Sequence, residues 1–137
     1  MLAVNDLAHQ IVTKKKMQFQ SSKFEQRDFI PISDICNAVR FEYSRKTNSN
    51  WGLFNLASSR TLTLSKLAEI ISGITEDVLG YKPEIGFPEI VNEKIQEELL
   101  FSNKKILTAG FTISGNIKKE IATLLLNSMK WFGHVKS

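Results

Sequence analysis

Hydrophobic positions along the chain follow helical spacing in three long stretches. Residues 4–12 place their apolar residues on one face of a helix that ends at the lysines 14–16. Residues 64–78 keep the same spacing up to Gly80. The last stretch carries Ile117, Ile121, Leu124, Leu125, Ser128 and Phe132 on one face. We therefore predict three amphipathic helices, each with one apolar face.

Polar residues and glycines mark the ends of these predicted helices. Thr63 is a suitable N-cap for the second helix, and Gly80 suits the position after its last turn. Either Ser114 or Asn116 can open the last helix, and Ser102 can cap a short helix that runs through residue 107.

A further helix is predicted after residue 32. Ser33 and Asp34 are both suitable N-caps for it. We expect it to bury three apolar residues, Ile35, Ala38 and Val39.

Short extended segments separate the predicted helices. Residues 17–20 alternate between apolar and polar, and residues 28–32 are extended because Pro31 disfavours helical geometry in the residue before it. Residues 51–58, "WGLFNLAS", are the strongest strand candidate, and residues 83–87 form a shorter one. The order helix, strand, strand, helix, strand, helix, strand, helix, helix predicts one compact α/β domain over residues 1–137.

Composition narrows the class of protein only slightly. The 137 residues carry a net charge of +4, with the positive charge in small lysine clumps. We find no apolar run close to the roughly 20 residues that span a bilayer and no signal peptide, so we expect a cytoplasmic protein without membrane contact. A single cysteine excludes an internal disulfide and provides no cysteine cluster for a metal, and no metal site is predicted.

Local motifs give little support for catalysis. Residues 110–119, "GFTISGNIKK", have the glycine spacing of a phosphate-binding loop but lack the Lys-Ser/Thr pair that the loop needs. His9 and His134 have no acidic residue at a spacing that would orient either as a base. We predict Cys36 to be a small buried residue rather than a nucleophile.

The pair Arg27-Asp28 is a stronger candidate for a binding site. It lies at the mouth of a predicted strand, where a side chain is held rigidly. The planar guanidinium of arginine suits a phosphate or a carboxylate. The alternative is a surface ion pair with Asp28 or another nearby acid, and local physics leaves both interpretations open.

Longer stretches of the sequence resemble a known family. "RDFIPISDICNAV", "GLFNLASSRTLTLSKLAEII" and "KPEIGFP" follow one another in the order found in the C-terminal part of extended short-chain dehydrogenases/reductases, the NAD-dependent nucleotide-sugar epimerases and dehydratases. "FSNKKILTAGFTISGNIKKEI" and "MKWF" resemble the closing segment of that family. The resemblance implies a small, compact α/β substrate-binding lobe with short strands and about five helices.

The resemblance also implies roles for particular residues. Arg27 matches the arginine that contacts the diphosphate or nucleotide of the substrate, and Asp28 and Asp34 match positions that hold the local backbone and the start of the helix.

Three further matches are less direct. Asn5 resembles an asparagine that some members place near the substrate phosphates, and Asn55 matches a structural position. Many members have a second arginine before the final short helix, where the nearest cation in this chain is Lys94.

Two motifs of the family are missing from this chain. No Gly-rich dinucleotide turn occurs among its seven glycines, and neither tyrosine is followed by a lysine four positions later. We therefore predict no catalytic and no cofactor-binding residue here. NAD belongs to the parent enzyme, and this chain alone binds none. The expected partners are a nucleotide sugar and a Rossmann domain in cis or in trans, and an isolated lobe is expected to expose apolar surface and self-associate.

Three functions follow from the sequence. The first is the nucleotide-sugar-binding part of an NAD-dependent epimerase or dehydratase, inactive alone. The second is a non-catalytic module that binds nucleotide sugars. The third is a basic nucleic-acid-binding domain, which requires the lysine clumps to share one face and is the least favoured.

Overall fold

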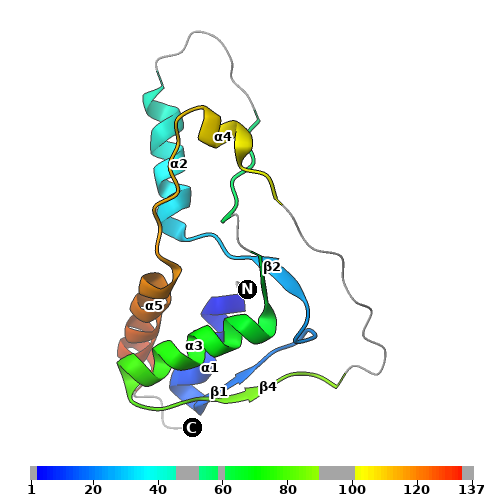
Figure 1. The fold of residues 1–137 in the computed structure, drawn as a ribbon. Helices are drawn as coiled ribbons and strands as arrows, with labels where there is room; N and C mark the ends of the chain where they lie inside the picture. Colours follow the sequence, from blue (N-terminus) through cyan, green and yellow to red (C-terminus); the bar gives the residue numbers. More distant parts are fainter. Residues whose placement is uncertain (1–2, 46–52, 59–60, 90–100, 134–137) are drawn as a thin grey trace.

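The computed structural model describes residues 3–45, 53–58, 61–89 and 101–133. This part of the chain contains five helices and four short strands (Figure 1). Their bounds, in chain order, are α1 Ala3–Lys14, β1 Lys16–Gln18, β2 Gln26–Asp28, α2 Ile32–Ser44, β3 Thr61–Thr63, α3 Leu64–Leu79, β4 Glu84–Gly86, α4 Lys104–Thr108 and α5 Ile117–Phe132. The predicted α/β class with about five helices and short strands is confirmed.

The main core lies where α1, α3 and α5 pack together (Figure 1). The central side chains are almost fully buried and come from all three helices and from β1: Ile11, Met17, Leu67, Ile71 and Leu125. Burying each of these side chains stabilises the fold by about 1.5–3 kcal/mol before the entropy cost. The helical spacing seen in the sequence therefore identified the buried faces of α1, α3 and α5, except that Phe132 at the end of α5 is exposed.

The predicted ends of two helices are also confirmed. Thr63 caps α3 through its hydroxyl, which accepts a hydrogen bond from the Lys66 N–H (3.2 Å). Gly80 ends α3 in the left-handed conformation (φ 77°), which costs glycine little. Asn116 caps α5 through its side-chain oxygen, which accepts from the Lys119 N–H (3.1 Å).

The strands form two small, separate sheets. β1 pairs with β4 in parallel, with Met17 opposite Ile85. β2 pairs with β3 antiparallel, with Arg27 opposite Leu62. β3 was not predicted as a strand, because its sequence Thr-Leu-Thr was interpreted as the approach to the cap of α3.

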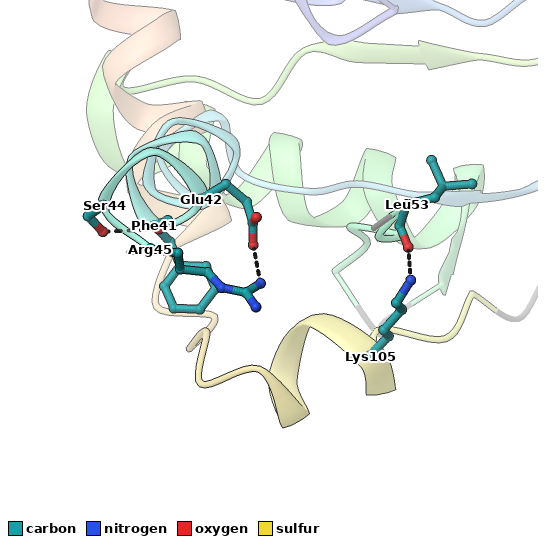
Figure 2. A network of polar contacts seen from close by, with 6 residues as sticks. All are labelled: Phe41, Glu42, Ser44, Arg45, Leu53 and Lys105. Carbon is teal, nitrogen blue, oxygen red and sulfur yellow. Dashed lines mark hydrogen bonds and ion pairs between the residues drawn. The ribbon is translucent and has the colours of Figure 1, made fainter. Parts of the chain in front are cut away.

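A second, smaller cluster joins α2, α4 and the segment 53–58. Its buried members are only three residues, Ala38, Ile106 and Phe111. On one side of it, Lys105 of α4 donates a hydrogen bond to the Leu53 carbonyl oxygen (2.7 Å). Figure 2 shows this contact and the ion pair between Arg45 and Glu42 at the end of α2 (2.8 Å). This region is therefore held more by polar contacts than by a deep core.

The prediction of a strand over residues 51–58 is wrong for 53–58, the residues of that range that the structure describes. They form no strand: side chains bind the backbone of Leu53, Ala57 and Ser58, and no described strand pairs with the segment. The amide of Asn103 accepts from the Ala57 N–H (2.7 Å) and donates to the Ala57 carbonyl. Asp28 accepts from the Ser58 N–H (2.8 Å).

The predictions for α2 are partly wrong. The helix begins at Ile32, after Pro31, so neither Ser33 nor Asp34 is its N-cap. Of the apolar residues expected to be buried, only Ala38 is, whereas Val39 is 66% exposed. The cause is the small contact area of α2, which buries the side containing Asp34 and Ala38 and leaves the rest open.

Cys36 is exposed, so its prediction as a buried residue is wrong. It lies on α2, on the part of the surface that the small second cluster leaves uncovered. Among the described residues, no helix is long and apolar enough to cross a membrane.

Candidate functional site

A pocket of about 300 Å³ lies between α1, β1, β2 and the start of α3. Its apolar lining includes four buried side chains, Leu7, Phe19, Leu64 and Leu67. Its polar lining consists of Asp6, Gln18, Gln20, Ser21 and Arg27. The pocket therefore combines a rigid apolar floor with a cation and several hydrogen-bonding groups.

Arg27 reaches this pocket from the middle of β2. Its side chain is 53% exposed and forms an ion pair with Glu25. One guanidinium N–H also donates to the Gln26 carbonyl oxygen (3.3 Å). The Glu25 side chain is only 15% exposed, so an anionic ligand that takes its place must form stronger contacts with Arg27 than this carboxylate does. The nearby acid that pairs with Arg27 is thus Glu25, and the side chain still lines the pocket.

Asp28 has a different role from its neighbour. Successive side chains of a strand point to opposite faces. The Asp28 carboxylate accepts from the Ser58 N–H (2.8 and 3.1 Å) and from the Ser58 hydroxyl (3.0 Å). Asp28 therefore ties the segment 53–58 to β2. It forms no ion pair with Arg27, which pairs with Glu25 instead.

Asp34 is fully buried in the first turn of α2. Its Oδ1 accepts from the N–H groups of Ser114 (2.9 Å) and Gly115 (2.8 Å). A Cβ on Gly115 would lie 2.5 Å from Asp34 Oδ2 and 2.6 Å from Pro31 Cβ, so only glycine fits there. Asp34 thus fastens α2 to the segment that precedes α5.

Neither Asn5 nor Asn55, the two remaining predicted residues that the structure describes, lines this pocket. Asn5 is exposed on α1 and does not line it, although the adjacent Asp6 does. Asn55 is exposed and lines a separate shallow hollow with Leu53 and Lys105. Lys94 lies outside the described residues. The proposed roles of these residues stay predictions.

Asp6 was missed by the sequence reasoning. Its Oδ2 accepts from the side-chain amide of Gln10 (2.8 Å), one helical turn later. The Gln10 oxygen in turn accepts from the Gln18 N–H on β1 (2.9 Å). The four-residue spacing between Asp6 and Gln10 was the only signal in the sequence that could have indicated this pair.

Glu120 was also missed, and it lies at a wider groove of about 680 Å³ between α2 and α5. Its carboxylate accepts from the Ile32 N–H (2.7 Å), the Ser33 N–H (3.0 Å) and the Ser33 hydroxyl (2.5 Å). Burial raises the pKa of Glu120, but hydrogen bonds from Ser33 and Ile32 outweigh it and lower the pKa below its usual value. This carboxylate therefore caps α2 from α5.

The described residues contain no metal-binding cluster and no glycine turn of the kind that opens a dinucleotide site. No group of three His, Cys, Asp or Glu side chains lies close enough together among them to hold a metal ion. Their two positive-φ glycines, Gly80 and Gly110, follow helices α3 and α4 rather than opening a helix after a strand.

The fold of the chain is shared with part of each of two larger solved structures. The chain is similar in structure to RMD from Pseudomonas aeruginosa, solved in complex with NADPH, with a TM-score of 0.73 and 18% sequence identity over 95% of this chain. It is also similar to TunA, an NAD-dependent NDP-hexosamine 5,6-dehydratase involved in tunicamycin biosynthesis, with a TM-score of 0.66 and 17% identity over 94% of this chain.

The two solved structures are much longer than this chain. The chain spans 42% of RMD and 40% of TunA. No family model matches the sequence. No curated protein matches it either.

Proposed function

We propose that the chain is the nucleotide-sugar-binding part of an NAD-dependent sugar-nucleotide enzyme of the epimerase/dehydratase type. The observation that carries the proposal is the pocket at Arg27, where an exposed guanidinium lies beside an apolar pocket floor. The enzymes named for the two similar structures support the same class, since one is complexed with NADPH and the other is an NAD-dependent NDP-hexosamine dehydratase.

In this proposal the two parts of the pocket bind two parts of the ligand. The nucleoside lies on the apolar floor of the pocket. The diphosphate lies at the exposed edge, where Arg27 forms charge-assisted hydrogen bonds with it. Binding exchanges the ion pair of Arg27 with Glu25 for contacts with a doubly charged group. Because Glu25 is only 15% exposed, the exchange leaves a largely buried carboxylate without this partner, and the contacts with the diphosphate must offset that cost.

The proposed function also requires a second part, a Rossmann domain in cis or in trans. Bound there, NAD would accept and return a hydride, whereas this chain would hold and orient the substrate. The sequence supports this division, because it lacks the Gly-rich turn and the Tyr-x-x-x-Lys motif. The surface of α2 supports it too, because Ile32 (63%), Val39 (66%) and Tyr43 (93%) are exposed on it. We propose that the Rossmann part covers this face.

The test is the thermal stability of the chain with and without GDP, UDP and CDP. A ligand that binds only the folded state stabilises it by about 2.7 kcal/mol at 100 times its Kd. We expect a rise in Tm with at least one diphosphate and its loss in Arg27→Ala. Arg40→Ala is the matched control, because Arg40 is exposed on α2 and does not line the pocket. No shift with any of the three nucleotides would overturn the proposal.

A further inference from the structure

The carboxylate of Asp6 gives the pocket a second charged group besides Arg27. It projects from the first turn of α1 and is partly buried. A carboxylate repels the phosphates that Arg27 attracts, so it does not belong to the diphosphate end of the ligand. Its chemistry suits a part of the ligand that offers hydrogen-bond donors, which in a nucleotide is the base.

The orientation of this carboxylate is fixed by a chain of hydrogen bonds. Gln10 donates to Asp6 Oδ2 (2.8 Å), and Gln10 is itself held by the Gln18 N–H of β1 (2.9 Å). Within the described part of the chain, Oδ1 has no hydrogen-bond partner. Asp6 therefore presents one free oxygen and the second lone pair of the other oxygen, already aligned for a ligand.

The four common bases differ in what they offer to two parallel acceptors. Guanine carries N1–H and N2–H beside each other, so both carboxylate oxygens receive a hydrogen bond. Uracil places its single N3–H between two carbonyl oxygens, which repel a carboxylate. Adenine and cytosine each place one amino group beside a ring nitrogen that is itself an acceptor. A carboxylate at this position thus increases the affinity for guanine and lowers the affinity for the other three bases.

We infer that Asp6 makes the pocket selective for guanine, so that the ligand is a GDP-linked sugar. This inference rests on the proposed function and names the base that the function leaves open. The base lies against Leu7 and Leu64 with its Watson–Crick edge at Asp6, and the diphosphate extends toward Arg27. A pocket of about 300 Å³ holds one base and leaves the charged groups at its exposed edge.

The experiment is isothermal titration of the full 137-residue chain with GDP, UDP, CDP and ADP. A good bidentate contact to a base discriminates by about 1–3 kcal/mol, so we expect GDP to bind about tenfold more tightly than each of the others. In Asp6→Asn one acceptor becomes a donor of the same shape, while the remaining oxygen still serves Gln10. GDP affinity should fall about tenfold, and UDP affinity should not fall.

Asp77→Asn is the matched control. Asp77 is exposed on α3, ten residues beyond Leu67 of the pocket, which is about 15 Å along a helix. The Asp77→Asn substitution removes the same charge as Asp6→Asn. It therefore reproduces any general electrostatic effect on nucleotide binding without changing a contact with the nucleobase. The preference for GDP should remain unchanged in this variant.

The outcomes separate this inference from the proposed function. Equal affinity for all four nucleotides, with all binding lost in Arg27→Ala, overturns the selectivity and leaves the proposed function standing. No binding of any nucleotide overturns both. A GDP preference that survives in Asp6→Asn shows that another group selects the base. The ranking in the native chain needs no variant, so a poorly folded Asp6→Asn protein still leaves the inference open to refutation.

Discussion

Glu120 offers the sharpest test of how the two parts of the fold are joined. It lies on α5, a helix that packs in the main core, and its carboxylate binds the first turn of α2, whose own contacts with that core are few. We predict that Glu120→Ala loosens α2 while α1, α3 and α5 remain packed. Glu120→Gln is the companion variant, because it keeps one acceptor oxygen and removes the charge.

The size of the effect follows from the three hydrogen bonds. Losing the cap of a helix costs about 0.5–2 kcal/mol, and hydrogen bonds to charged groups contribute about 1.5–3 kcal/mol each when buried. Because the carboxylate is partly exposed, water takes over some of the freed donors in the variant. We therefore expect Glu120→Ala to cost about 2 kcal/mol and Glu120→Gln about 1 kcal/mol. Glu69→Gln removes the exposed ion pair with Lys66 and should change stability by less than about 0.5 kcal/mol.

The pH dependence has a definite sign. The pKa of Glu120 is lowered in the folded chain from its ordinary value of 4.5, so its contribution is complete above that value. It is lost as the pH falls through the folded pKa, because the carboxyl then protonates. The gap in stability between the native chain and Glu120→Gln should therefore be present at neutral pH and narrow in acid.

Two measurements check this prediction. Urea unfolding at about pH 7 and about pH 3.5 gives the free energies of unfolding. Hydrogen exchange of α2 and α3 locates the change, with faster exchange in α2 only. If exchange in α2 is the same in Glu120→Ala and the native chain, or if the gap to Glu120→Gln is as large in acid as at neutral pH, the reasoning is refuted.

Two further predictions concern the same region. Gly115→Ala forces a Cβ to within 2.5 Å of Asp34 Oδ2, so it should destabilise the chain by about 1–3 kcal/mol in urea unfolding. In the control Gly73→Ala the new Cβ meets nothing within 4 Å and should cause no such loss, and equal stability of the two variants would contradict the predicted contact. Val39→Glu on α2 should reduce self-association of the isolated chain in light scattering, and Leu126→Glu, an exposed residue of α5, should not; a monomeric native chain at high concentration would refute this.

The parts of the fold that the sequence predicted correctly are those fixed by neighbours along the chain. The apolar spacing of α1, α3 and α5 reports burial directly, since one face of each helix lies in the main core. Thr63 and Asn116 cap their helices through contacts three residues away, so their roles are readable locally. Arg27 was predicted at the mouth of a strand; it lies instead in the middle of β2, and its side chain lines a pocket.

The contacts that escaped prediction join residues far apart in the sequence. Glu120 binds α2 across 88 residues, and Asp34 binds the backbone of Ser114 across 80. Nothing local marks either carboxylate as a partner for a distant backbone. Asp34 was interpreted as an N-cap because that is the commonest use of aspartate beside a helix start, and the tertiary contact overrode that preference.

The two clearest errors, the strand at 51–58 and the buried side of α2, adjoin the same small cluster. Residues 54–56 have no backbone hydrogen bond within the described part of the chain, although their sequence has the apolar character of a buried strand. The exposed residues of α2 likewise keep the spacing of a covered helix, with Ile32, Val39 and Tyr43 open to solvent. Both patterns are satisfied at once if a sheet of the proposed Rossmann part pairs with this segment and packs on α2. The errors then reflect a sequence suited to a larger assembly.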